Sequence, residues 1–84
     1  MTEVELYTKP GCHLCDVARE IVETVLADYP EEEVSFVETD ILSAPQLVAE
    51  YGEKIPVVTI DGEVHSIWRV DSGRFRAAVE DATA

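Results

Sequence analysis

The sequence predicts a single α/β domain over residues 1–84, with the element order strand, helix, strand, helix, two strands, helix. Three observations support this order. Apolar and polar side chains alternate near the start of the chain, which predicts a strand over residues 3–8. Apolar residues after Cys12 recur at three- and four-residue steps, which predicts a long helix. Asp61-Gly62 separates two β-rich runs and predicts a hairpin.

In the first half of the chain, Pro10-Gly11 ends the first strand and the long helix runs to about Asp28. Pro30 prevents the helix from continuing, and residues 34–39 form the second strand. The two strands are expected to be parallel, because a helix crossover joins them. The apolar stripe of the helix consists of Leu14, Val17, Ala18, Ile21, Val22, Val25 and Leu26.

A short helix is predicted after Ser43, which can cap it and form a capping box with Gln46. Pro45 suits the first turn, where its missing N–H has no partner to lose. Gly52 is expected to end this helix. Its predicted inward-facing residues are Leu47 and Val48.

Residues 55–60 and 63–68 are predicted to pair as antiparallel strands around the Asp61-Gly62 turn. The final helix is expected to start near Asp71 or Ser72. Its predicted buried residues are Phe75, Ala78 and Val79.

The chain is strongly acidic, with a net charge of −12 from 18 acidic and 6 basic residues. Such a charge repels phosphate backbones and anionic lipids, so we expect no nucleic-acid or membrane partner. No apolar run is long enough to span a bilayer, and the start of the chain lacks the pattern of a signal peptide. With only two cysteines, too few for the disulfide framework of a small secreted domain, we therefore expect a cytoplasmic location. We also expect a monomer.

Both cysteines of the chain, Cys12 and Cys15, lie two residues apart between the first strand and the long helix. A C-x-x-C at such a junction is typical of a redox-active dithiol. Disulfide exchange needs an attacking thiolate and a second thiol that resolves the mixed disulfide. At the helix start, Cys12 would meet unpaired N–H groups and the positive end of the helix dipole, which lower a thiol pKa.

Neighbouring residues are candidates for tuning this site or contacting the substrate. Lys9 and protonated His13 would favour the Cys12 thiolate, whereas Asp16 would oppose it. An exposed position in the first turn, without a chemical role, is an equally weighted interpretation of His13. Leu14 belongs either to the helix stripe or to a rim that faces the substrate.

Pro56 follows Ile55 at the start of a predicted strand, and because the chain also contains the C-x-x-C pair we expect the Ile55-Pro56 peptide bond to be cis. The backbone beside it is a candidate to pair with an incoming peptide or glutathione. An ordinary trans proline at the start of an edge strand is the alternative. Tyr7 and Trp68 are candidates to flank a substrate groove, although aromatic residues in strands more often belong to the core.

Metal binding is the competing interpretation of the cysteine pair. Cys12, His13, Cys15 and His65 supply four possible zinc ligands. His13 lies between the two cysteines and converges poorly with both, and no second ligand pair is present. We therefore assign no metal ligand, and rank a zinc site or a cluster bridging two monomers below the dithiol.

The motif Tyr7-Thr8-Lys9-Pro10-Gly11-Cys12-x-x-Cys15, with Ile55-Pro56-Val57 and Asp61-Gly62, resembles glutaredoxin-like members of the thioredoxin superfamily. It is most similar to short bacterial proteins with a Gly-Cys-x-Leu-Cys-Asp motif. The resemblance implies a four-stranded mixed sheet in the order 2-1-3-4. It also implies that the first and third helices cover one face and the second helix covers the other.

The resemblance further implies that Cys12 is the nucleophile and Cys15 the resolving thiol, which form the redox-active disulfide Cys12–Cys15. Lys9 and Ile55-Pro56 match positions that hold glutathione in glutaredoxins. Residues 69–73 lack the glycine-rich acidic turn that also holds this ligand, so glutathione remains only one possible reductant.

The predicted function is a dithiol oxidoreductase that reduces protein or low-molecular-weight disulfides. Its expected partners are a disulfide-containing protein or a small thiol, and a reductase. No cofactor is expected, and the reductant is glutathione, another small thiol or an enzyme of the thioredoxin-reductase type. The alternative is a non-enzymatic module that binds a protein partner.

Overall fold

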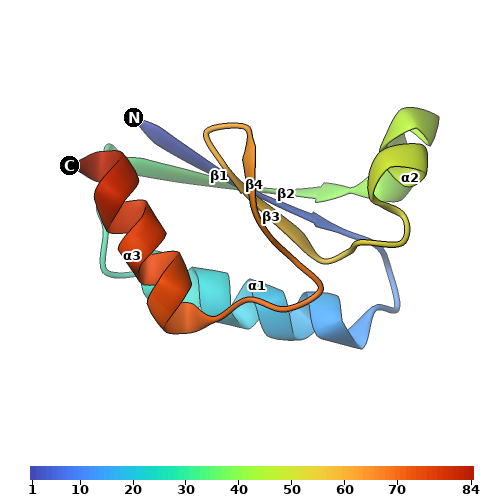
Figure 1. The fold of residues 1–84 in the computed structure, drawn as a ribbon, viewed down its shortest axis with the longest axis horizontal. Coiled ribbons are helices and arrows are strands. Elements are labelled where there is room, and N and C mark those ends of the chain that lie inside the picture. The colour runs from blue at the N-terminus through green and yellow to red at the C-terminus, as the bar shows by residue number, and fades with distance from the viewer.

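A computed structural model describes residues 1–84 and shows one four-stranded sheet in the order β2-β1-β3-β4. Helices α1 and α3 lie along one face of this sheet, and α2 lies on the other side near one end (Figure 1). The predicted element order, strand order and distribution of helices are confirmed. None of the helices combines the length and apolar character needed to cross a membrane.

The strands are β1 (Thr2–Thr8), β2 (Val34–Asp40), β3 (Val57–Ile60) and β4 (Glu63–Ile67). The helices are α1 (His13–Leu26), α2 (Pro45–Tyr51) and α3 (Ser72–Thr83), and a 3-10 turn, η1 (Ile41–Ser43), precedes α2. Most boundaries lie within two residues of those predicted. β3 begins one residue after Pro56, which has no N–H to donate to a sheet.

β1 is central, parallel to β2 and antiparallel to β3. β3 and β4 form the predicted hairpin around Asp61 and Gly62, whose φ angles are 51° and 85°. Positive φ at both central residues is the requirement of the tight turn that Asp-Gly favours. The sequence therefore determines this turn locally.

The main core lies between the sheet and helices α1 and α3, and Leu6, Val22 and Phe75 are fully buried within it. The apolar stripe of α1 is only partly covered, because Leu14 and Val17 remain 44% and 41% exposed. α3 lies against the later part of α1 (Figure 1), so the first turns extend beyond it. Ala78, predicted to be buried, is half-buried.

The predicted capping box of α2 is wrong. Ser43 is the last residue of η1, and Ala44 is the N-cap residue of α2, with no side-chain hydrogen bond. Asp40 caps η1 instead, since its carboxylate accepts the Leu42 N–H at 2.8 Å. The 3-10 turn that Asp40 starts therefore includes Ser43 before α2 begins.

The predicted inward face of α2 is also wrong at Val48, which is 41% exposed, whereas Leu47 is half-buried. No residue of this short helix is fully buried. Its main aromatic contact is the stacking of Tyr51 on Tyr7, with ring centroids 4.4 Å apart. Burial and the nearby Glu5 carboxylate raise the pKa of Tyr7 above its ordinary value, so its ring stays neutral.

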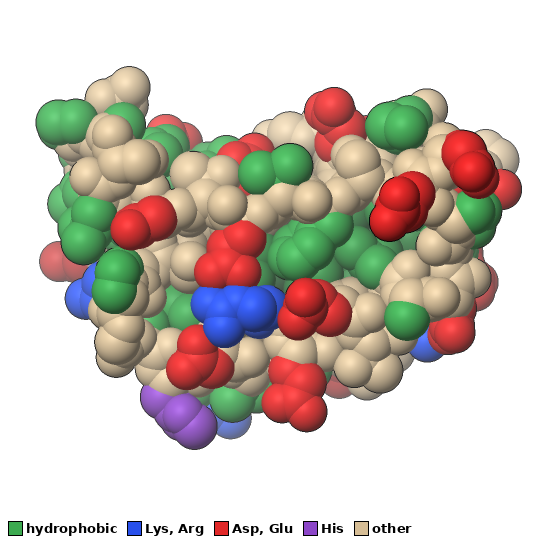
Figure 2. Space-filling view, turned by 180° about the vertical axis from the view of Figure 1, so that it is seen from behind, with side chains coloured by type: hydrophobic (Ala, Val, Ile, Leu, Met, Phe, Trp, Pro, Cys, Tyr) green, Lys and Arg blue, Asp and Glu red, His purple; other side chains and the backbone are tan.

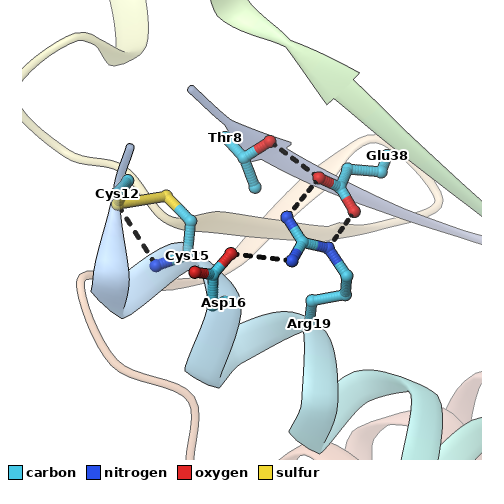
Figure 3. A network of polar contacts seen from close by, with 6 residues as sticks. All are labelled: Thr8, Cys12, Cys15, Asp16, Arg19 and Glu38. Atoms are coloured by element: carbon cyan, nitrogen blue, oxygen red, sulfur yellow. Dashed lines mark hydrogen bonds and ion pairs between the residues drawn. A yellow bond between two sulfur atoms is a disulfide. The ribbon is translucent and has the colours of Figure 1, made fainter. Parts of the chain in front are cut away.

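An ion-pair network joins α1 to the sheet beside the cysteines (Figure 3). The Arg19 guanidinium donates hydrogen bonds to both carboxylate oxygens of Glu38 on β2, and the distance from Nη2 to Oε2 is 2.7 Å. Glu38 also accepts the Thr8 hydroxyl at 3.0 Å, and Arg19 donates to Asp16 at 2.8 Å. The network holds the start of α1 against the ends of β1 and β2.

The Glu38→Gln substitution tests this network. The hydrogen bonds from Arg19 lower the pKa of Glu38 below its ordinary 4.5, so its contribution to stability is complete above about pH 4.5 and lost as pH falls further. At pH 7 the substitution should reduce the free energy of unfolding by about 0.5–1 kcal/mol. Urea titrations should show the difference vanish near pH 3. A difference from the parent that is constant from pH 3 to 7 contradicts this, and Glu20→Gln is the matched control.

The core assignment is tested by a matched leucine pair. Leu6 is fully buried, whereas Leu42 is 61% exposed. Leu6→Ala should lower the free energy of unfolding by about 2–5 kcal/mol, because it leaves a cavity under α1. Leu42→Ala should change it by less than about 0.5 kcal/mol. Equal losses in urea unfolding would show that the core is wrongly placed.

Candidate functional site

Cys12 and Cys15 form a disulfide at the start of α1, with their Cα atoms 5.2 Å apart. Cys12 is the N-cap residue in an extended conformation, and Cys15 lies in the first turn. Gly11 turns the chain from β1 into the helix with a φ of +77°, a conformation that glycine adopts without steric cost. The strand, the turn and the helix start therefore set the position of both sulfur atoms.

The Cys12 sulfur occupies the place of a helix-capping oxygen, since the Cys15 backbone N–H donates to it at 3.2 Å (Figure 3). A helix N-terminus favours negative charge on such an atom. Cys12 is half-buried and Cys15 is completely buried. The arrangement thus offers one sulfur to solvent and keeps its partner beneath it.

Negatively charged side chains outnumber positively charged ones on the surface near this site. Acidic side chains are spread over the face shown in Figure 2, and basic ones are few. Arg19 pairs with Asp16, the residue next to Cys15, and so offsets the carboxylate nearest to the sulfurs in sequence. Lys9 is exposed and forms no ion pair, which leaves its ammonium group free in the turn before Cys12.

The Ile55-Pro56 bond is cis, as predicted, and Pro56 is buried. Tyr7 on β1 is paired with Val57 on β3, so the antiparallel register places Pro56 beside Thr8. This is the end of β1 from which the chain enters the cysteine turn. The fold therefore brings the proline and the dithiol to the same end of the sheet.

The other predicted site residues surround this end of the sheet. His13 and Leu14 are exposed in the first turn of α1, so Leu14 does not belong to the buried stripe. Ile55 is half-buried and its N–H donates to the Tyr51 carbonyl at 3.1 Å. The Ile55 carbonyl oxygen is left as the group that can accept a hydrogen bond from a substrate backbone.

The structural role of Trp68 was missed by sequence reasoning, which placed it at the end of a strand, either flanking a substrate groove or in the core. It lies just beyond β4 with a φ of 66° and is 55% exposed. Its backbone N–H donates to the carbonyls of Lys54 and Pro56, and its indole N–H donates to the Glu53 carbonyl at 2.9 Å. Trp68 therefore stabilises the position of the segment that contains the cis proline. No local sequence signal indicates these contacts.

The four possible zinc ligands do not come together. His65 lies on β4, where its ring packs against Phe75 of α3 with centroids 5.7 Å apart. Cys12 and Cys15 are bonded to each other. No group of three or more histidine, cysteine or carboxylate side chains is placed to hold a metal ion.

Comparison with known structures supports the fold. A structural-genomics target, protein XcR50 from X. campestris, superposes with a TM-score of 0.73 at 28% identity, covering 93% of this chain and 96% of its own. Oxidised mitochondrial thioredoxin 3 from Saccharomyces cerevisiae gives a TM-score of 0.68 at 15% identity, covering 95% and 77%. The second similarity is one of fold alone.

Sequence comparison identifies the family. "Uncharacterized protein Rv0508" from Mycobacterium tuberculosis (H37Rv) is 36% identical over 96% of this chain and 86% of its own length. A thioredoxin from Methanocaldococcus jannaschii is 34% identical over 77% and 76%. The model of the glutaredoxin-like domain (DUF836) matches residues 3–80. Together with the thioredoxin fold and the Cys12–Cys15 disulfide, which support a general thiol–disulfide redox role, this match shows that the chain belongs to the glutaredoxin-like family of the thioredoxin superfamily.

Proposed function

We propose that this protein is a dithiol oxidoreductase that reduces disulfides of proteins or small molecules, with Cys12 as nucleophile and Cys15 as resolving thiol. The observation that supports this most is the half-buried Cys12 sulfur, which accepts a helix N–H above a fully buried Cys15. A thiolate at that position is stabilised and accessible, as an attacking group must be.

The reaction starts from the reduced dithiol. The Cys12 thiolate attacks one sulfur of the substrate disulfide, whose other sulfur leaves as a thiolate and takes up a proton. Cys15, after losing its proton, then attacks the Cys12 sulfur of the mixed disulfide. This step releases the second substrate thiol and forms the Cys12–Cys15 disulfide. Two electrons pass to the substrate, and an external thiol or reductase must return them.

The proposed substrate contacts surround the Cys12 sulfur. Lys9 supplies a free positive charge on one side, and the exposed His13 and Leu14 form the rim on the helix side. The carbonyl of Ile55, next to Pro56, can accept an N–H from the backbone of a bound substrate. These contacts suit a peptide segment or a small peptide-like thiol.

The segment between β4 and α3 offers little for glutathione. Val70 is buried, and the Asp71 carboxylate already accepts the Arg74 N–H at 2.9 Å as the N-cap of α3. Val70 is therefore inaccessible and Asp71 has one carboxylate oxygen left, so this segment offers fewer groups for a peptide amine or carboxylate than a glycine-rich acidic turn does. A reductase of the thioredoxin-reductase type suits the site better as electron donor.

Substituting each cysteine by serine tests the assignment of roles. Cys12→Ser should abolish disulfide reduction, because the attacking sulfur is lost. Cys15→Ser should still attack but cannot resolve, so a covalent adduct between Cys12 and the substrate should accumulate and be visible by mass spectrometry. If both variants reduce a protein disulfide at the rate of the parent, the proposal is wrong. If the wild-type protein reduces no disulfide with any reductant, the alternative function, a non-enzymatic module that binds a protein partner, is favoured.

The choice of reductant is tested with one disulfide substrate and two electron supplies. We expect NADPH with thioredoxin reductase to support at least tenfold faster turnover than glutathione with its own reductase, a difference of about 1.4 kcal/mol in the barrier. NADPH consumption measures both rates. Faster turnover with glutathione would show that the segment before α3 binds it despite the contacts of Asp71.

A further inference from the structure

A second polar site lies along β4, separate from the dithiol. Edge strand β4 and the start of α3 border an open pocket of about 410 Å³, here called the β4 pocket. This volume lies within the roughly 300–1,000 Å³ range of small-molecule sites. The polar residues that line it are His65, Ser66, Arg69, Asp71 and Arg74.

A β-bulge turns two adjacent side chains of β4 toward this pocket. Val58 on β3 is paired with Ser66 and Thr59 with Val64, so His65 is the extra residue. Val58 belongs to the core beneath α1 and α3, which places Ser66 on that same face. The ring of His65 packs on Phe75 and therefore also lies on the α3 side. Bulges often redirect side chains in this way next to functional sites.

The Ser66 hydroxyl is buried and has no hydrogen-bond partner. Leaving a buried polar group unsatisfied is unfavourable, and the few such groups in a folded protein call for an explanation. A serine hydroxyl can donate to an oxygen of a bound ligand. Ser66 lines the β4 pocket, and its hydroxyl is free to donate to a ligand that binds there.

Two unpaired guanidinium groups complete the site. Arg69 and Arg74 form no ion pair, although the chain carries 18 acidic residues. Asp71 is the one carboxylate that lines the pocket, and one of its oxygens is used in capping α3. The positive charge at this pocket therefore exceeds the negative charge, in contrast to the molecule as a whole.

We propose that the β4 pocket binds the phosphate group of a small molecule. Two guanidinium groups, a hydroxyl and an imidazole offer more donors than the two oxygens of a carboxylate can use, whereas a phosphate has enough oxygens and about two negative charges. Burial and the charge of Arg74 lower the pKa of His65, so at pH 7 its ring is neutral and donates through one N–H. The remaining volume accommodates the organic part of a phosphate monoester.

Amide NMR at constant ionic strength tests this proposal, with inorganic phosphate and glycerol 3-phosphate as probes and acetate as comparator. We expect saturable shifts at Ser66 and Arg74, and at least tenfold weaker binding of acetate. Tighter binding of glycerol 3-phosphate than of inorganic phosphate identifies the ester as the ligand type, and the reverse identifies free phosphate. Saturation by neither probe, or equal affinity for acetate, overturns the proposal.

Three variants localise the binding. Arg74→Gln should weaken phosphate binding about tenfold, the loss expected for one charge-assisted hydrogen bond. Arg76→Gln is the matched control, because Arg76 on the same helix pairs with Asp28 at 2.8 Å, and should retain affinity. Ser66→Ala should weaken binding without lowering the melting temperature of the free protein, since its hydroxyl has no partner to lose. Equal effects of the two arginine variants contradict the site.

The dithiol is not part of this test. Cys12→Ser should bind phosphate as the parent does, so failure of the redox proposal and failure of the phosphate proposal give different results. If the Cys12→Ser variant loses the shifts at Ser66 and Arg74, the anion site is not separate from the dithiol and the inference is wrong.

Discussion

The hydrogen bond from the Cys15 N–H to the Cys12 sulfur is the contact on which both the helix start and the site depend. A helix begins with unpaired N–H groups, and serine, threonine, aspartate or asparagine usually satisfies one of them. Here a cysteine sulfur does so. Any charge that develops on this sulfur is therefore stabilised by the same contact that holds the first turn of α1. Local structure and thiol chemistry cannot be altered separately at this position.

The rest of the fold fixes where this helix start lies. β1 is paired on both sides, parallel to β2 and antiparallel to β3. These pairings fix the position of its last residue, from which the cysteine turn begins. Arg19 then holds α1 to Glu38 on β2, about one helical turn beyond Cys15. Pro56 approaches from β3 on the other side of β1. The dithiol is thus supported on two sides by rigid elements, as a precise reactive geometry requires.

Local signals in the sequence were sufficient for the element order and the hairpin, whereas the cis bond at Pro56 was predicted only in combination with the distant cysteine pair. The Asp61-Gly62 turn depends on two residues alone, and the C-x-x-C lies where strand periodicity gives way to helix periodicity. Predictions from the sequence were wrong where a distant or competing contact decides the start of a helix or the burial of its residues. A capping box needs the helix to start at Ser43, but Asp40 had already started a 3-10 turn there. Periodicity indicates which residues share a face of α1, but not how far α3 extends along it.

For a related reason, the sequence could not predict the bulge at His65 or the left-handed backbone conformation of Trp68. Neither position holds glycine, the residue whose presence usually signals such a backbone. Trp68 is held in its conformation by carbonyls from the segment before β3, and these contacts exist only after the sheet has formed. Both irregularities lie at β4, the strand that borders the proline segment and the β4 pocket. Departures from local preference are expected to concentrate at sites with a function.

The distribution of positive charge connects the two proposed sites. Only two of the six basic side chains form ion pairs, in a chain where carboxylates are three times as frequent. The four unpaired ones are Lys9, Lys54, Arg69 and Arg74. Lys9 precedes the cysteine turn, Lys54 precedes the proline segment, and the two arginines line the β4 pocket. If basic residues served only to offset surface acidity, most would pair with the carboxylates that surround them. The two arginines at the β4 pocket are better explained by an anion that binds there, and Lys9 by its place before the cysteine turn.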